Sequence, residues 1–515
     1  MRQSASSLMF FCAVLTAAAW SPDALQKGLV LLQQNRPAEA LEQLTLAEKQ
    51  DPSNSRIRNF RGIALTQVGR YEEAAAEYHE AIQLDPRLAD AYRNLGYVEW
   101  SRHHLKEAEQ ALRSSLQLTP GDPRAQYYLG RVMLDQQNYT GGLDVLEKAQ
   151  ALWPHDAGFL LQVVKAYLEV GRRRNARQVL ARTQALPLTE TQQVQCGALW
   201  MAAHDKATGL DVFESLAKKH THEQWAVVDL ALAQLAADKP GEALATARSV
   251  PETRRSSPLW TIIGIASART GDHGRAVDAF RMAATLAPFQ EERWMDLTRE
   301  LMGRGQYVDA VAAAREAVSR IPRSYALRLR LGAAHMKAGQ YREAEAIFRD
   351  LVAQGDPRPT SAVGLAQTLL REARPEEALR VLVDVERRLG RTFLLSYFQG
   401  IALDRAGKHE EAIARFQDAV QLNPSSGDAY RWLGKAELRA GRVEQAIADL
   451  KQALRLDPSS QPARRLLIQA YATKKQPVEE TLLRAGVESD EVPKSMGEEA
   501  ADFLVPAWEL PPKAQ

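Results

Sequence analysis

Small and bulky apolar residues alternate along the chain in a pattern that repeats every thirty-four residues. Glycine marks the most regular position, at Gly28, Gly62, Gly96 and Gly130. Proline keeps the same step twenty-four residues later, at Pro52, Pro86, Pro120 and Pro154. Two residue types that share one period indicate an internal repeat. We number each repeat from 1 to 34, with this glycine at position 8.

The remaining positions of the repeat predict a pair of packed helices. Positions 20 and 27 carry small residues, which let two helix backbones approach closely: Ala40, Ala74, Ala108 and Gly142, then Ala47, Ala81, Ser115 and Ala149. Positions 7, 11 and 24 are bulkier and apolar at helical spacing. Position 15 is glycine in seven repeats, which predicts a left-handed residue at the end of the first helix: Gly69, Gly171, Gly271, Gly305, Gly339, Gly407 and Gly441. Proline at position 32 ends the second helix.

This pattern resembles that of the tetratricopeptide repeat family over roughly residues 21 to 475. The family's large aromatic residue at position 4 is present only in some repeats, at Tyr92, Trp260, Trp294 and Tyr430. The resemblance implies an all-α fold, an α-α superhelix in which about 13 helix-turn-helix repeats form a right-handed solenoid with a C-terminal capping helix. It also implies that the first helix of each repeat makes most of the inner wall.

The regularity of the repeats varies along the chain and divides it into five segments. We predict a signal peptide at 1–20, an N-terminal array at 21–190, two degenerate helical repeats at 191–256, a C-terminal array with its capping helix at 257–475, and a tail at 476–515. Repeats contact only their neighbours, so the degenerate pair is the expected place for a softer joint. The tail is acidic and proline-rich, a composition typical of a disordered segment.

The first twenty residues favour export. Met1 and Arg2 precede an apolar run, Leu8 to Ala19, that ends in small residues suited to signal cleavage. The run is shorter than the roughly twenty residues that span a bilayer. An uncleaved anchor or a buried first helix is the alternative. We therefore expect an extracytoplasmic protein, periplasmic or secreted, with no stable membrane span after cleavage.

Charge and motifs argue against nucleic-acid binding and catalysis. Sixty-six Lys and Arg residues nearly balance sixty-four Asp and Glu residues, for a net charge of +2, which gives no field that draws the chain to nucleic acid. No nucleophile elbow, zinc-protease motif or paired cysteine motif is present. Cys196, His204, His220 and His222 are zinc-type ligands, yet a buried thiol and helix-end histidines explain them more simply. We expect no cofactor, no metal and no catalysis; the alternative is an unfamiliar enzyme site within 190–256.

Binding residues are expected in the groove. The family resemblance implies that positions 2, 5, 9 and 13 face this concave surface. The N-terminal candidates are Arg93, Tyr97, Arg124, Tyr127 and Arg131. The C-terminal candidates are Tyr397, Arg405, Arg431, Lys435, Arg439 and Arg465. Cations beside aromatic rings suit a carboxylate-bearing peptide or an anionic glycan; the alternative is a solvated groove without a fixed ligand.

The leading functional hypothesis is an exported scaffold that mediates protein–protein interactions in a bacterial envelope or secretion assembly. It would bind extended protein or peptide segments, including acidic ones, in the concave groove. The alternative is a carbohydrate-associated subunit of an exopolysaccharide export system, with an anionic polysaccharide as the partner. A sequence rich in repeats specifies fold more sharply than function.

Overall fold

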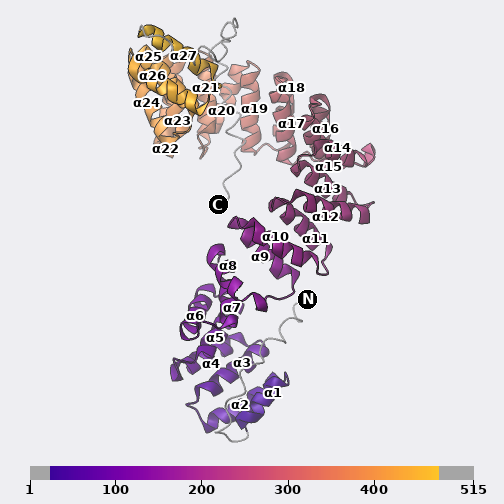
Figure 1. Cartoon of the computed structure of the whole chain (residues 1–515). Coiled ribbons are helices and arrows are strands. Elements are labelled where there is room, and N and C mark those ends of the chain that lie inside the picture. The colour runs from indigo at the N-terminus through magenta and orange to yellow at the C-terminus, as the bar shows by residue number, and fades with distance from the viewer. Residues whose placement is uncertain (1–23, 475–515) are drawn as a thin grey trace. The chain divides into compact units, whose positions relative to one another are not determined.

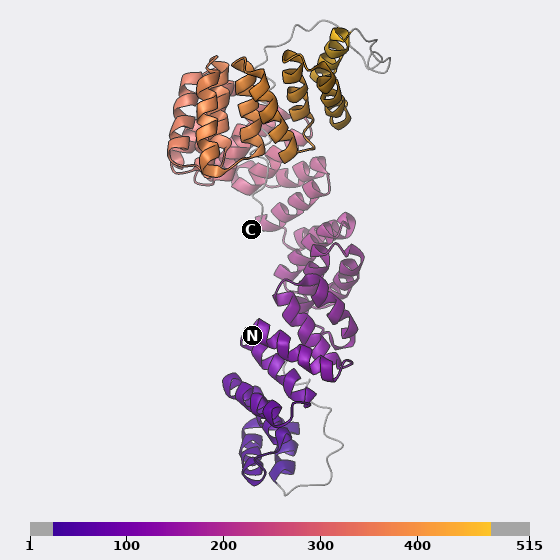
Figure 2. The ribbon, with the colours of Figure 1, turned by 90° about the vertical axis from the view of Figure 1, so that its left-hand side faces the viewer.

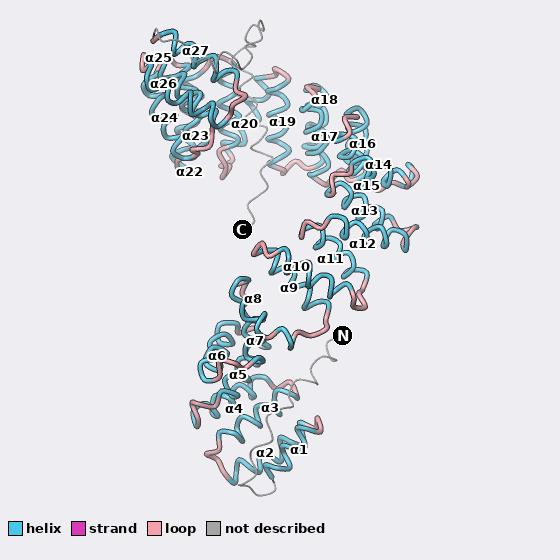
Figure 3. The backbone as a smooth tube through the Cα atoms, viewed as in Figure 1, coloured by secondary structure: helices cyan, strands magenta, loops and turns pink. Residues whose placement is uncertain are grey.

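The computed structural model describes residues 24–474, and within this range the chain is all-α. It contains 27 α-helices and two short 3-10 segments, Gln150–Leu152 and Glu252–Arg254, and no strand (Figure 3). The predicted signal peptide and the predicted acidic tail lie outside the described residues. The chain divides into two compact units, Met1–Lys239 and Pro240–Gln515. The boundary falls inside the segment predicted to be degenerate.

The described helices of unit 1 are α1 to α13: Ala24–Gln33, Pro37–Gln50, Ser55–Gln67, Tyr71–Leu84, Ala89–Ser101, Leu105–Leu118, Pro123–Asp135, Tyr139–Lys148, Ala157–Glu169, Arg173–Gln184, Glu190–Ala202, Lys206–Lys219 and Gln224–Ala236. Those of unit 2 are α14 to α27: Pro240–Arg248, Ser257–Arg269, His273–Leu286, Glu291–Gly303, Tyr307–Arg320, Tyr325–Lys337, Tyr341–Ala353, Thr360–Arg371, Pro375–Leu389, Phe393–Arg405, His409–Leu422, Gly427–Arg439, Val443–Leu456 and Gln461–Thr473.

Within each unit, consecutive helices lie side by side and form a helical solenoid (Figures 1 and 2). Six of the thirteen predicted pairs are present in unit 1 as α1 to α12, and six are present in unit 2 as α15 to α26, followed by α27. The helices of the remaining pair, α13 and α14, belong to different units. The capping helix is also confirmed: α27 packs on α26 with Leu467, Ala470 and Tyr471 buried, while Arg465 is exposed. None of the described helices combines the length and apolar character needed to cross a bilayer.

The glycine at position 8 is required by close helix packing. In the second repeat a Cβ on Gly62 of α3 would lie 2.5 Å from the Tyr78 ring of α4. In unit 2 a Cβ on Gly400 of α23 would lie 2.6 Å from the Phe416 ring of α24. Both rings are fully buried. The large side chain of the second helix therefore fills the space that the missing Cβ leaves on the first.

The glycines at position 15 adopt the predicted left-handed conformation. All seven have φ between +71° and +83°. Non-glycine residues take the same conformation at the equivalent turns of other repeats, at Asn35, His103, Gln137, His204, Asp238 and Ala373. The turn between the two helices of a repeat therefore has one backbone geometry, whichever residue occupies it.

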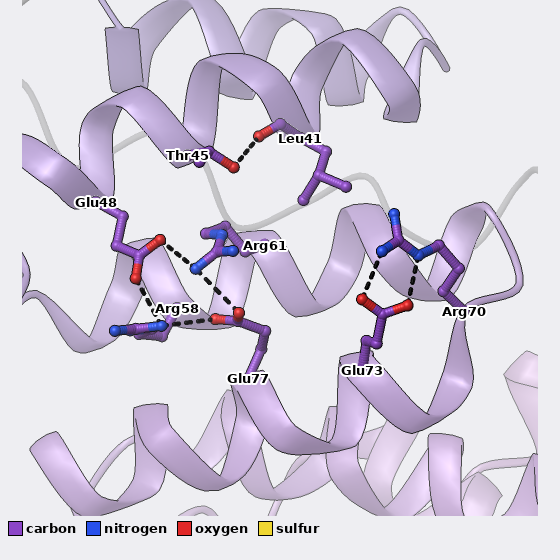
Figure 4. Close-up of polar contacts among 8 residues, drawn as sticks. All are labelled: Leu41, Thr45, Glu48, Arg58, Arg61, Arg70, Glu73 and Glu77. Carbon is purple, nitrogen blue, oxygen red and sulfur yellow. Dashed lines mark hydrogen bonds and ion pairs between the residues drawn. The ribbon is translucent and has the colours of Figure 1, made fainter.

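An ion-pair network joins the first two repeats on α2, α3 and α4 (Figure 4). Arg58 lies 2.7 Å from Glu48 and 3.4 Å from Glu77, and Arg61 pairs with Glu48 and, at 2.9 Å, with Glu77. These four side chains are only 13–22% exposed. Burial raises the pKa of Glu77, an effect that the two arginines oppose. Nearby, the Thr45 hydroxyl donates to the Leu41 carbonyl at 2.7 Å.

Candidate functional site

Aromatic side chains gather on the first helices of the third and fourth repeats, in unit 1. Tyr97 and Trp100 of α5 and Tyr128 of α7 form one cluster: the Tyr97 and Tyr128 ring centroids are 5.0 Å apart, and the Trp100 and Tyr128 centroids 6.3 Å. All three are half-buried. Together with Arg131 they define what we call the aromatic surface. Two neighbouring repeats thus present rings that are partly open to a ligand.

Arg131 of α7 is held among these rings. Its guanidinium lies 4.9 Å from the Trp100 ring centroid and 4.8 Å from that of Phe159 on α9. It also donates to the Tyr127 hydroxyl at 2.9 Å. Each cation–π contact contributes about 0.5–1 kcal/mol. The predicted residue Arg131 is therefore preorganised, whereas Tyr127 is only 5% exposed and packs beneath it.

Asp135, at the end of α7, links three repeats through the aromatic surface. Its carboxylate accepts from the Trp100 indole N–H at 2.7 Å and from the Gln162 amide of α9 at 2.9 Å. These bonds fix the orientation of the Trp100 ring. Burial raises the pKa of Tyr128 to about 12 and also raises that of Tyr97. Both phenols are therefore neutral at physiological pH and can donate hydrogen bonds.

The other two N-terminal candidates flank the aromatic surface. Arg93 of α5 pairs with Asp90 at 2.6 Å and with Asp122 at 2.8 Å, so its charge is already balanced. Arg124 of α7 is half-buried and makes no ion pair within residues 24–474. Of the two, Arg124 is better placed to meet a carboxylate of a ligand.

Position 13 carries a cation in four successive repeats of unit 2. Lys337, Arg371, Arg405 and Arg439 end the first helices α19, α21, α23 and α25, thirty-four residues apart. We call this set the cationic column. These first helices contact one another in order, α19 with α21, α21 with α23 and α23 with α25, so the column follows the stack of repeats.

Arg405 lies close enough to two other cations of the column, Arg371 and Arg439, to be repelled by them. The pKa of the Arg405 guanidinium is lowered by burial and by its neighbours Arg371 and Arg439. Asp404 offsets part of this charge: its fully buried carboxylate accepts from Arg439 at 2.6 Å and contacts the His409 ring at 3.1 Å.

Two C-terminal candidates are buried, contrary to what groove exposure requires. Tyr397 is fully buried and its hydroxyl donates to Asp428. Arg431 is 4% exposed and donates to the same carboxylate at 2.8 Å. Both therefore stabilise the contact between α23 and α25 instead of presenting a binding group. Lys435, half-buried, lies 4.0 Å from the Trp432 ring centroid.

Sequence reasoning found Arg405 and Arg439 but missed four residues of these surfaces. Trp100 and Tyr128 stand at positions 12 and 6, outside the groove positions that the family resemblance supplies. Lys337 and Arg371 stand at position 13, and the thirty-four-residue spacing of basic residues could have revealed them. The exposed candidate Arg465 lies on α27, beyond the column.

The cysteine and histidines of the degenerate segment do not converge. Cys196 of α11 is 1% exposed, and burial raises its pKa to about 11, which keeps the thiol protonated and unreactive. His220 lies 3.1 Å from Glu190 and 5.0 Å from the Trp225 ring centroid. Within residues 24–474, no group of three or more His, Cys, Asp or Glu side chains is arranged to hold a metal ion.

The stacked helix pairs and their repeated inner surfaces define a helical-repeat protein. The chain belongs to the tetratricopeptide repeat family. Family patterns described as tetratricopeptide or TPR repeats match residues 62–101, 93–157, 224–249, 301–361, 363–426, 397–461 and 433–480. The family resemblance inferred from the sequence is thus confirmed.

Curated relatives match short stretches of the chain. A TPR repeat-containing thioredoxin of Arabidopsis thaliana is 37% identical over 92 residues, 16% of this chain and 14% of the relative. The cell division cycle protein 27 homolog of Caenorhabditis elegans is 31% identical over 129 residues, 25% of this chain and 16% of the relative. The chain therefore spans less than a fifth of either relative.

Solved structures of similar architecture cover most of the chain at low identity. Yeast Tom70 matches 89% of this chain and 97% of its own, with 13% identity and a TM-score of 0.40. The Cut9–Hcn1 hetero-tetramer of the APC/C matches 86% and 95%, with 12% identity and a TM-score of 0.35. At these identities the likeness concerns fold alone.

Proposed function

We propose that the chain is an exported scaffold that binds extended segments of partner proteins, and that the aromatic surface of unit 1 is the principal docking place. The observation that carries this proposal is the half-buried cluster of Tyr97, Trp100 and Tyr128 around the preorganised Arg131. Rigid rings beside an arginine bind with little loss of conformational entropy. Proline or aliphatic side chains would stack on the rings, and a carboxylate would meet Arg124.

Export and an envelope or secretion setting are parts of the same proposal. They are supported by the positive start and the apolar run Leu8 to Ala19, which lie outside the described residues. Detection of the mature protein in the periplasm or medium, with a new N-terminus near Trp20, tests this part. An intact N-terminus in the cytoplasm would contradict it.

The docking proposal is tested by affinity capture from envelope extracts. The full chain with Tyr97→Ala and Arg124→Glu is compared with Arg113→Glu, a matched change at a 58% exposed arginine of α6. We expect the double variant to lose its extended-segment partners and the control to keep them. Retention of every partner by a folded double variant would contradict docking at this surface.

The alternative function, a carbohydrate-associated subunit of an exopolysaccharide export system, is favoured by the cationic column, because stacked cations suit a polyanion. Salt-sensitive binding of an acidic polysaccharide, lost on neutralising the column, is its test.

A further inference from the structure

The aromatic surface of unit 1 is richer in hydrogen-bond donors than in acceptors. The neutral Tyr128 hydroxyl can donate, and Nε of Arg131 is buried with no acceptor among the described residues. Asp135, the carboxylate at the border of this surface, already accepts from the Trp100 indole and the Gln162 amide. A ligand that presents acceptors and few donors is therefore favoured.

Proline is the residue type that fits this imbalance. Every other residue of an extended segment has a backbone N–H that loses water on docking, whereas proline has a carbonyl and no N–H. An N–H that is buried without an acceptor weakens the complex. A proline-rich segment also adopts the polyproline II conformation before it binds, so that little conformational entropy is lost.

The three rings are spaced and tilted in a way that suits such a segment. The centroids of Tyr97, Trp100 and Tyr128 lie 5.0–6.3 Å apart, and the ring planes are inclined to one another by 40–58°. Rings tilted in this way do not cover one another's faces as stacked rings do. Polyproline II rises by about 3.1 Å per residue, so neighbouring rings match ligand positions about two residues apart.

Opposite charges stand at the two ends of α7, on either side of Tyr128. Arg124 lies at the start of the helix and the exposed Asp135 is its last residue. Asp122, which caps the helix, is already paired with Arg93. Eleven residues of helix separate Arg124 from Asp135, about 16 Å along the axis. A polyproline II segment covers this distance in about five residues.

Donor content, ring spacing and charge together define the chemistry of one ligand. We propose that the aromatic surface binds a proline-rich segment of a partner protein in the polyproline II conformation, with a carboxylate of the segment beside Arg124 and a cation about five residues away beside Asp135. This inference rests on the docking function proposed above and adds to it the kind of segment that docks.

Two matched peptides test the preference for proline. The first is a fluorescent peptide with the order glutamate, Pro-Pro-Ala-Pro and lysine, and the second has alanine in place of each proline. Both are titrated into the wild-type full-length chain and followed by fluorescence anisotropy. We expect the alanine peptide to bind at least about tenfold more weakly, because its additional N–H groups find no acceptors and its backbone must be ordered on binding.

A charge exchange tests the position of the ligand's carboxylate. Arg124→Glu should weaken binding of the proline peptide at least about tenfold, and a peptide with lysine in place of its glutamate should regain affinity for this variant. Arg113→Glu makes the same change at a 58% exposed arginine of α6 and should leave binding of the proline peptide unchanged. Equal loss in the two variants would reduce the effect to net charge and overturn the proposal.

The comparison of the two peptides uses wild-type protein, so it does not depend on how well a variant folds. Equal affinity for both peptides, or binding of neither, overturns the proposal. The docking function is judged separately, because it stands if Tyr97→Ala with Arg124→Glu loses partners in the capture experiment. Binding of a neutral oligosaccharide and of neither peptide would also overturn the proposal, because the surface would then be a glycan site.

Discussion

The two units place different chemistry at the same positions of one repeat. At position 13, unit 1 has Gln67, Ser101, Asp135 and Glu169, whereas unit 2 has Lys337, Arg371, Arg405 and Arg439. In unit 1 the acidic residue Asp135 orients an indole and an amide; in unit 2 the basic residues form the cationic column. The helix pair that supports both is the same. The chemistry at position 13 is therefore set by the residue that occupies it and not by the backbone.

The third and thirteenth repeats also differ, although both contain aspartate at position 2 and arginine at position 5. Arg93 of the third repeat has two carboxylate partners and is 15% exposed. Arg431 of the thirteenth is 4% exposed and shares Asp428 with Tyr397. One sequence motif thus makes a half-buried pair in unit 1 and, in unit 2, a pair whose arginine is more deeply buried.

The largest predicted effect on stability comes from a substitution that breaks this buried pair. Asp428→Ala leaves the Arg431 charge and the Tyr397 hydroxyl buried without their shared acceptor, and should lower the free energy of unfolding of unit 2 by about 3 kcal/mol. Asp90→Ala is the matched control and should cost less than about 1 kcal/mol, because Asp122 still pairs with Arg93. Denaturant unfolding followed by hydrogen exchange of peptides from each unit measures both. Equal losses of unfolding free energy in the two variants would contradict this difference between the two repeats.

The next largest predicted effect is on the pH dependence of stability, and it comes from glutamates at position 11 of the repeat. Glu99 of unit 1 contacts Arg102 at 2.8 Å and His104 at 2.7 Å. Glu437 of unit 2 is 2% exposed, and burial, with repulsion from Asp449, raises its pKa to about 8. The folded chain then retains a proton that the unfolded chain releases near pH 4.5. The contribution of this proton to the free energy of unfolding is fully present at low pH and is lost as the pH rises to about 8.

We expect the stability of unit 2 to fall by on the order of 2 kcal/mol between pH 5 and pH 9. Glu437→Gln should stabilise unit 2 at pH 9 and flatten this dependence, whereas Glu99→Gln should destabilise unit 1 by about 1 kcal/mol because it breaks two charged contacts. Thermal unfolding of each variant across this pH range is the measurement. A variant Glu437→Gln that is less stable than wild type at pH 9 would contradict the assignment.

The repeat period predicted what depends on local spacing, and missed what depends on neighbouring repeats. Helix pairs and left-handed glycines follow from residues within one repeat, and both are confirmed. The burial of Tyr397 and Arg431 could not be predicted, because it depends on Asp428, which stands thirty-one residues from Tyr397 and belongs to the next repeat. Trp100 was missed because the residue that holds it, Asp135, is likewise one repeat away.

The smallest predicted effect concerns the turn at position 15, where unit 2 has five glycines and Ala373, and where the unit 1 turns include Asn35. Ala373 has φ of +59°, a conformation that costs a residue with a Cβ roughly 1 kcal/mol. Ala373→Gly should therefore stabilise unit 2 by about 0.5–1 kcal/mol, even though glycine gains entropy in the unfolded chain. Asn35→Gly, at φ of +58°, should change stability by less than about 0.5 kcal/mol, because asparagine tolerates this conformation. Equilibrium denaturation of both variants measures the difference between these two stability changes. A loss of stability in Ala373→Gly would contradict the prediction, because the unfolded-state entropy of glycine would then outweigh the strain that glycine relieves.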